Sequence, residues 1–164
     1  MRVIGIDPGN TESAYCIIDG DTLRPIDFGK MENDVLRRYL RQNATFEEED
    51  RAAIEMVASY GMAVGRDVFD TCRWVGRFEE ILTRKLYVPP RLIYRKEEKL
   101  HICHDSRAKD ANIRRALIDR FAEHDLKNGK GTKKDPDWFY GFSNDVWAAY
   151  SVALVFAEVY RGKV

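Results

Sequence analysis

The chain is 164 residues long, a length that suits one domain and is too short for two well-developed ones. Its 45% hydrophobic and 12% aromatic residues are enough to form a buried core. Its 27 basic and 27 acidic side chains give a formal net charge of zero, which argues against a uniformly basic nucleic-acid-binding protein. No run of 18 apolar residues occurs, and Met1 leads directly into a strand-like segment, so we expect no membrane span, no signal peptide and a cytoplasmic location. The three cysteines, Cys16, Cys72 and Cys103, are odd in number and widely spaced, which is typical of reduced thiols in the cytosol.

Hydrophobic runs, helical periodicity and turn residues predict the secondary structure. Strand candidates are short apolar runs that end at turn residues, and helix candidates carry apolar residues three or four positions apart. In chain order, the predicted elements are strands over 2–6, 14–19 and 24–29, a helix over 34–42, a strand over 52–57, a helix over 62–84, a strand over 91–95, and helices over 109–121 and 144–161. A Gly- and Lys-rich segment over 127–137 is predicted to be a mobile loop.

The order of these elements predicts one mixed sheet. The first three strands follow one another through short turns, which favours an antiparallel meander, and helices lead to the two later strands. No internal repeat or linker divides the chain, so we expect a single domain over residues 1–164. We therefore predict an α/β fold of the RNase H-like type, with a mixed five-stranded sheet and helices on both faces.

Three carboxylates occupy positions that this fold brings together. Asp7 ends the first strand, before Pro8 and Gly9 turn the chain, Glu55 lies in the otherwise apolar fourth strand, and Asp145 opens the last helix. Each also has a structural interpretation, as a turn residue, a paired buried acid or a helix cap. Together they offer the oxygen ligands that Mg²⁺ or Mn²⁺ prefers, and two such ions about 4 Å apart promote phosphodiester hydrolysis.

Segments around and between these carboxylates also carry a resemblance to a known family. In chain order they are Ile4-Gly5-Ile6-Asp7-Pro8-Gly9, Asn10-Thr11-Glu12-Ser13-Ala14-Tyr15, Ile54-Glu55-Met56-Val57, Ala58-Ser59-Tyr60-Gly61-Met62, Trp138-Phe139-Tyr140-Gly141-Phe142 and Asp145-Val146-Trp147-Ala148-Ala149-Tyr150. The chain resembles RuvC-type Holliday junction resolvases, with the greatest similarity to the compact phage and prophage branch. The resemblance implies a metal-dependent endonuclease with Asp7, Glu55 and Asp145 as catalytic and metal-binding residues. It further implies a homodimer that cuts branched DNA symmetrically, leaves 5′-phosphate and 3′-hydroxyl ends, and works in the cytosol of a bacterium or a phage-infected host.

The chain departs from that family at two positions. Bacterial members carry an acidic residue or a His three positions before the last Asp, where this chain has Phe142. The other candidates for a fourth metal ligand are Ser143, Asn144, Asp135 and Asp137, and the sequence favours none of them. The same members place a Phe against junction bases three positions after the strand Glu. Ala58 stands there, so Tyr60 becomes the candidate DNA-contacting wedge.

Basic side chains are concentrated in the second half of the chain. From Arg84 to Lys134 there are 15 Lys and Arg against 7 Asp and Glu, a pattern typical of a surface that binds a polyanion or of a solvated charged face. Similarity to the basic segment of the resembling family favours Lys109, with Arg107 beside it, as a residue that stabilises charge at the scissile phosphate. The candidates for further phosphate contacts, from the loop, are Lys130, Lys133 and Lys134.

Other patterns leave alternatives open. The aromatic residues over 138–142 suit either a core or base stacking. The spacing of His101 and His104 lacks the second ligand pair of a zinc site, so we expect none. An actin-like ATPase is excluded because that branch duplicates the domain. The remaining rivals are a DNA-binding module with weak or no cleavage and a nuclease that acts on other branched DNA or on RNA.

Overall fold

The computed structural model describes residues 1–59 and 61–162, in which two layers of helices enclose one sheet. The strands are β1 (Arg2–Asp7), β2 (Glu12–Asp19), β3 (Pro25–Glu32), β4 (Arg51–Met56) and β5 (Arg91–Tyr94). The helices are α1 (Asn33–Arg38), α2 (Arg66–Leu86), α3 (Arg95–Cys103), α4 (Asp110–Phe121) and α5 (Asn144–Val155), and π-helical turns over Tyr39–Asn43 and Phe156–Tyr160 continue α1 and α5. No helix in the described part of the chain is long and apolar enough to cross a membrane.

The sheet confirms the predicted mixed topology. Its strand order is β3-β2-β1-β4-β5, in which β1 pairs antiparallel with β2 and parallel with β4, and β4 pairs parallel with β5. Ile6 of β1 lies opposite Ile54 of β4. The next residue of each strand is an acid, so the register places Asp7 and Glu55 at the same end of the sheet.

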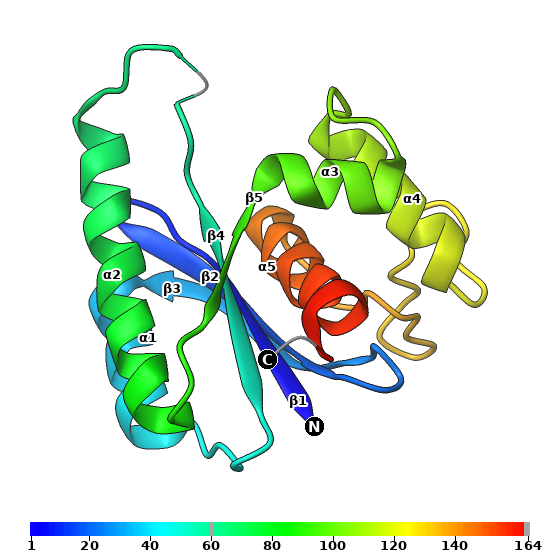
Figure 1. The fold of residues 1–164 in the computed structure, drawn as a ribbon. Coiled ribbons are helices and arrows are strands. Elements are labelled where there is room, and N and C mark those ends of the chain that lie inside the picture. Colours follow the sequence, from blue (N-terminus) through cyan, green and yellow to red (C-terminus); the bar gives the residue numbers. More distant parts are fainter. Residues whose placement is uncertain (60, 163–164) are drawn as a thin grey trace.

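Side chains alternate between the two faces of the sheet, and each face has its own hydrophobic core. Ile4 and Ile6 point towards α1 and α2, where Phe78 and Leu82 are buried against them. Val3 belongs to the opposite core, which the sheet shares with α4, α5 and the aromatic segment before α5. Figure 1 shows α1 and α2 on one side of the sheet and α3, α4 and α5 on the other. The prediction of helices on both faces is therefore confirmed.

Helix α5 crosses β1 at Gly5, where the two backbones come very close. A Cβ atom on Gly5 would lie 2.1 Å from the carbonyl oxygen of Ala149 and 2.8 Å from the backbone nitrogen of Ala153. No side chain fits in that space, so the helix can pack at this height only over a glycine. Asp145 stands one helical turn before Ala149. The crossing thus places Asp145 near the end of β1, where Asp7 lies.

Helix α3 was not predicted from the sequence, because its pattern is misleading. Its residues are mostly charged, and the side chain that it buries completely is Glu98 rather than an apolar residue. Helix α2 begins at Arg66, later than the predicted position 62, with Gly65 as its N-cap. It ends where Tyr87 adopts a left-handed conformation with φ of 57°, shortly before Pro89.

We expect the substitution Gly5→Ala to lower the free energy of unfolding by about 3 kcal/mol, the upper part of the usual range for an overpacked core. Urea denaturation followed by circular dichroism measures the change. Gly76→Ala is the matched control, since Gly76 lies inside α2 and an added Cβ would meet nothing within 4 Å. That control should gain roughly 0.5–1 kcal/mol from helix propensity. A Gly5→Ala protein as stable as wild type would show that the crossing is not a constraint.

Candidate active site

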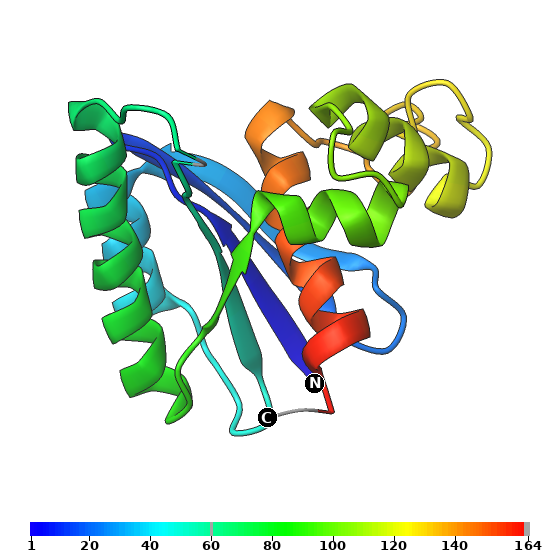
Figure 2. The ribbon, with the colours of Figure 1, turned by 45° about the horizontal axis from the view of Figure 1, so that its top comes forward.

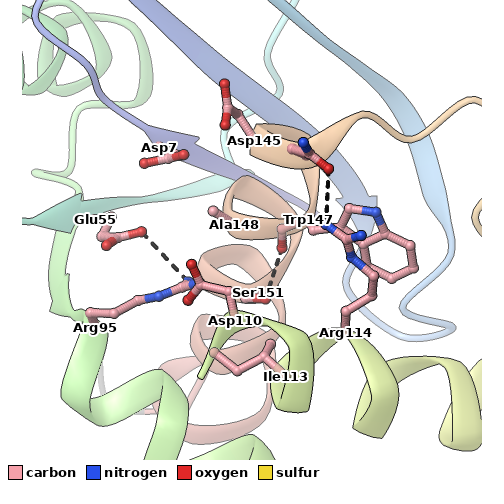
Figure 3. Close-up of a pocket in the computed structure, with 11 residues that line it drawn as sticks. Asp7, Glu55, Arg95, Asp110, Ile113, Arg114, Asp145, Trp147, Ala148 and Ser151 are labelled. Carbon is pink, nitrogen blue, oxygen red and sulfur yellow. Dashed lines mark hydrogen bonds and ion pairs between the residues drawn. The ribbon is translucent and has the colours of Figure 1, made fainter. Parts of the chain in front are cut away.

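A cleft of about 570 Å³ opens where β1 and β4 end and α4 and α5 begin. All three carboxylates predicted from the sequence line it, namely Asp7, Glu55 and Asp145. A fourth acid, Asp110, lines the same cleft from the first turn of α4. Figure 3 shows these side chains around the open space, each contributed by a different element. The fold thus gathers carboxylates that are far apart in the sequence.

Asp7 and Glu55 are largely buried at the floor of the cleft, and the electrostatic consequences are strong. Burial raises the pKa of Asp7 to about 8, and the nearby negative charges of Glu55 and Asp145 act in the same direction. Burial also raises the pKa of Glu55, while the positive charge of Arg95 opposes that shift. The floor of the cleft is therefore a place where negative charge is concentrated and incompletely neutralised.

Asp145 is the most accessible of the three predicted acids, with 43% of its side chain exposed. Its carboxylate forms an ion pair with Lys30 of β3, with Oδ2 and Nζ 2.8 Å apart. The same ammonium group lies 3.0 Å from a carboxylate oxygen of Glu12. In Figure 3 the Asp145 carboxylate is turned away from Glu55. Lys30 thus holds Asp145 at the rim of the cleft.

Arg95 is a site residue that the sequence analysis missed. It is the first residue of α3, and its guanidinium donates hydrogen bonds to Glu98 at 2.6 Å and to Asp110 at 2.7 Å. Its Nη1 also lies 3.7 Å from Oε2 of Glu55. Arg95 therefore links the floor of the cleft to α3 and α4. The one local signal for a role of Arg95 was Glu98, an acid three positions further along the chain, at a spacing that allows an ion pair within a helix. No sequence spacing indicated that Arg95 would also pair with Asp110.

Glu98 lies beneath Arg95 and is fully buried. One of its carboxylate oxygens accepts the Arg95 hydrogen bond, and Oε1 has no hydrogen-bond partner within the described residues. Burial raises the pKa of Glu98 well above its usual value, and the negative charge of Glu55 adds to the effect. Because an unpaired buried charge costs several kcal/mol, Arg95 is the group that makes this arrangement tolerable.

The donor set of the cleft suits a hard divalent cation, since Asp7, Glu55, Asp145 and Asp110 all offer carboxylate oxygens. In the side-chain geometry described for residues 1–59 and 61–162, no group of three or more His, Cys, Asp or Glu side chains is gathered closely enough to hold a metal ion. The reason is visible in the contacts, because Asp145 is turned to Lys30 and Arg95 lies beside Glu55. Burial and the nearby charges of Glu55 and Asp145 raise the pKa of Asp7, and a bound cation would neutralise those charges.

The structure also accounts for the candidates for a fourth ligand. Phe142 is buried and makes edge contacts with Phe28 and Trp147, so this position belongs to the core. Phe139 is fully buried in the same cluster, which confirms the core interpretation for these two aromatics. Asn144 lines the cleft, where its side-chain oxygen accepts a hydrogen bond from Arg114. Neither of the two candidate acids, Asp135 and Asp137, lines the cleft, whereas Asp110, which the sequence analysis did not single out, does.

Asp137 has a different task, which excludes it as a ligand. Its carboxylate accepts hydrogen bonds from the backbone N–H groups of Glu123, His124, Asp125 and Trp138, at 2.8, 2.9, 2.6 and 2.6 Å. Asp125 in turn accepts N–H groups of the following loop, including that of Gly131 at 3.0 Å. The segment over 127–137, predicted to be a mobile loop, is therefore tied down by two carboxylates.

The predicted DNA-contacting residues that the structure describes do not line the cleft. Lys109 is exposed at the N-cap of α4, next to Asp110, and Arg107 is exposed in the loop before it. Lys133 and Lys134 are exposed in the later loop, whereas the ammonium group of Lys130 donates a hydrogen bond to the Phe142 carbonyl at 2.5 Å. Tyr60 lies outside the described residues. His101 pairs with Glu158 at 2.6 Å, a contact that ties α3 to the end of the chain.

No protein-family model and no curated protein matches the chain by sequence. Solved structures do match it by fold. The Thermus thermophilus RuvC structure in complex with a Holliday junction substrate matches with a TM-score of 0.68 and 13% identity, over 99% of this chain and 96% of that one. A second Thermus thermophilus RuvC structure matches with a TM-score of 0.63 and 15% identity, over 96% and 93%. The predicted RNase H-like fold and the resemblance to RuvC are thus confirmed at the level of the fold, and the phage branch stays a prediction.

The role of Asp137 gives a test of stability against pH. Its four hydrogen bonds hold the pKa of the folded state well below the usual value, although burial acts in the opposite direction. Its contribution is therefore complete above the unfolded pKa of about 4 and is lost as the pH falls towards the folded value. We expect Asp137→Asn to lower the free energy of unfolding by about 2 kcal/mol at neutral pH, and by clearly less at low pH.

Urea denaturation near pH 7 and near pH 3 measures both values. The exposed neighbour Asp135, with 79% of its side chain accessible, provides the control Asp135→Asn, which should change stability by less than about 0.5 kcal/mol. An Asp137→Asn effect of equal size at both pH values would contradict the proposed cause.

Proposed function

We propose that this protein is a metal-dependent endonuclease that resolves four-way DNA junctions by hydrolysing phosphodiester bonds, leaving 5′-phosphate and 3′-hydroxyl ends. The observation that carries the proposal is the cleft in which Asp7, Glu55, Asp145 and Asp110 converge, on a fold shared with RuvC. The fold alone carries many activities, so the function is argued from the site. The carboxylates of the open cleft could bind the metal that hydrolysis needs, and the basic residues beside them could bind a polyanionic substrate such as DNA.

Asp7, Glu55 and Asp145 would hold the Mg²⁺ or Mn²⁺ ions, two in each site, and Asp110 adds a fourth oxygen donor at the rim. Bound metal supplies an activated water and stabilises the leaving oxygen. Asp7 and Glu55 are fixed by neighbouring strands, so their spacing is set by the sheet register. Asp145 lies in the first turn of α5, where Lys30 pairs with its carboxylate. To bind metal, the carboxylate would have to leave Lys30 and turn into the cleft.

The basic part of the chain provides the surface for DNA. Residues 84–134 include β5, α3 and α4, and Figure 2 shows α3 lying across α5 with α4 beside it. We assign Lys109 to the scissile phosphate, since it directly precedes Asp110 of the cleft. Arg107, Lys130, Lys133 and Lys134 would contact other phosphates, and Tyr60 would contact junction bases. These side chains bind and orient the strand, and Lys109 also stabilises charge as the bond breaks.

One observation favours a second candidate, a DNA-binding module with weak or no cleavage. The Asp145–Lys30 pair and the proximity of Arg95 to Glu55 neutralise part of the carboxylate cluster without any metal. Cleavage assays on four-way junctions, forks, flaps and RNA duplexes, each with Mg²⁺, Mn²⁺ or EDTA, separate this candidate from a nuclease. The same assays identify a nuclease that prefers other branched DNA or RNA.

We expect Asp7→Asn to reduce junction cleavage to below one-tenth of the wild-type rate, while the affinity for the junction changes by less than twofold. The substitution removes a carboxylate that would bind metal at the floor of the cleft and leaves the DNA surface intact. Gel-shift binding in EDTA and single-turnover cleavage with Mg²⁺ measure the two effects. Asp34→Asn, at an exposed Asp of α1 that pairs with Arg37, is the control and should cleave normally. Cleavage by Asp7→Asn above one-tenth of wild type would count against Asp7 as a ligand.

A resolvase that cuts two equivalent strands needs two sites related by a two-fold axis. We expect a homodimer of about twice the 19.0 kDa chain mass. Helix α2 offers the contact, because Phe69 is 61% exposed there and Met62 and Val64 are exposed just before it. Light scattering should show a dimer for wild type and a monomer for Phe69→Glu. Tyr87→Glu, at the exposed opposite end of α2, should remain dimeric. A wild-type protein that stays monomeric even on a junction would exclude symmetric resolution.

A further inference from the structure

A second hollow, of about 330 Å³, lies beside the cleft and is lined by Arg95, Lys96 and Lys99 of α3 and by Ser106 of the following loop. We call it the α3 hollow. Arg95 lines both spaces, so the hollow and the carboxylate cleft adjoin each other. Its side chains are three cations, which only donate hydrogen bonds, and one serine hydroxyl, which can also donate. None of the residues assigned so far to DNA contacts lines it.

The two lysines of the α3 hollow are not neutralised by the protein itself. Within the described residues, neither Lys96 nor Lys99 has a carboxylate partner within ion-pair distance. The acid between them is engaged elsewhere, because Glu97 accepts hydrogen bonds from the Tyr94 backbone N–H at 3.0 Å and from the Tyr160 hydroxyl at 2.5 Å. The next acid, Glu98, is buried against Arg95.

The position of Lys99 adds to this picture. Lys99 is half-buried and lines the hollow, a position that allows a lysine to pack its aliphatic stem and keep its charge towards open space. A hydrogen bond from Arg95 lowers the pKa of Asp110, and the charge of Lys99 acts in the same direction. The field of Lys99 thus reaches the rim of the cleft, where the scissile phosphate would lie.

These features specify a ligand of one chemical class. Lysine ammonium groups bind phosphate as point charges and a serine hydroxyl donates a further hydrogen bond. No aromatic ring and no carboxylate lines the hollow, and its one guanidinium, that of Arg95, is already held by Glu98 and Asp110, so its two lysines favour a phosphate over a base. A DNA strand that places one phosphate against the carboxylates of the cleft has another phosphate close by on each side.

We infer that the α3 hollow binds a backbone phosphate of the DNA strand that is to be cut, adjacent to the scissile phosphate. This inference rests on the proposed function and adds the path of the strand, which runs from the cleft across the first turns of α3. Arg95 fixes the boundary between the two phosphates, since Glu98 and Asp110 hold its guanidinium in place. Lys96, Lys99 and Ser106 would then set the register of the strand.

The first test measures affinity for a fluorescent four-way junction in EDTA, where no strand is cut. In the variant Lys96→Met/Lys99→Met the stems remain and both charges are lost, so packing is preserved. We expect at least fivefold weaker binding and a slope of log affinity against log salt that is smaller by about 1, the value for one released phosphate contact. Lys85→Met is the control, because Lys85 is likewise half-buried and lies on α2, on the opposite side of the sheet.

The second test locates the phosphate. Neutral methylphosphonate linkages are placed one at a time along the junction strand, and each is bound to wild type and to the double variant. We expect one position, next to the cleavage site, where the neutral linkage weakens wild-type binding at least fivefold and the variant by less than twofold. Equal losses for both proteins at every position would overturn the inference.

The outcomes separate the inference from the proposed function. One outcome is that a neutral linkage weakens wild-type binding at one position and hardly affects the double variant, while no strand is cut in Mg²⁺ or Mn²⁺. That result would support the α3 hollow as a phosphate site and exclude the nuclease activity. Cleavage by wild type without any coupling would retain the nuclease and remove this strand path. Absence of junction binding by the wild-type protein would overturn both.

Discussion

The arrangement of the site depends on the contact between α5 and β1 at Gly5. There the backbone of α5 lies so close to the strand that a Cβ atom would fall 2.1 Å from the Ala149 carbonyl oxygen. The small residues on both sides of this contact, Gly5 below and Ala149 and Ala153 above, set the height of the helix. From that height follow the position of Asp145 and the width of the cleft. A bulkier contact would lift α5 and separate the acids that the sheet register brings together.

Carboxylates gathered in one cleft repel one another, and basic side chains partly offset this repulsion. Lys30 takes up Asp145 at the rim, and Arg95 lies among Glu55, Glu98 and Asp110 at the floor. The pKa of Asp7 is raised mainly by burial, and the negative charges of Glu55 and Asp145 add to that shift despite the opposing charge of Arg95. Burying like charges together is destabilising unless something offsets it, and perturbed carboxylates in a cleft are characteristic of functional sites. A divalent cation is the natural complement of such a cluster.

The basic side chains fall into two groups that differ in their surroundings. Arg95 is held by carboxylates and belongs to the architecture of the site. Lys96 and Lys99 lie one and four positions further along the same helix and have no such partners within the described chain. Helix α3 thus places Arg95, which is paired with acids, at the cleft, and Lys96 and Lys99, which have no carboxylate partner among the described residues, at the neighbouring hollow. This division is what makes α3 suited to guide a phosphate backbone past a carboxylate cluster.

The sequence by itself determined the sheet and the three predicted acids, because those features follow from contiguous patterns. A short continuous apolar run and the turn at Pro8 and Gly9 define β1 and leave Asp7 at its end, and a single acid in an apolar strand identifies Glu55. Such patterns are local, so they are readable without the fold. The same reasoning failed for α3, because the side chain that this helix buries is Glu98, and burial of an acid leaves no hydrophobic pattern.

Only the tertiary structure decided which side chains meet across elements. The link from Arg95 to Asp110 joins the starts of α3 and α4, and the Lys30–Asp145 pair joins β3 to α5. Those pairs depend on the angles and heights at which helices pack on the sheet, and these result from the whole core. Sequence spacing carries no record of them, since ion pairs across elements have no fixed interval along the chain. Asp7, Glu55 and Asp145 were therefore predictable, whereas Asp110 and the cations that pair with the acids of the cleft became visible only in the folded molecule.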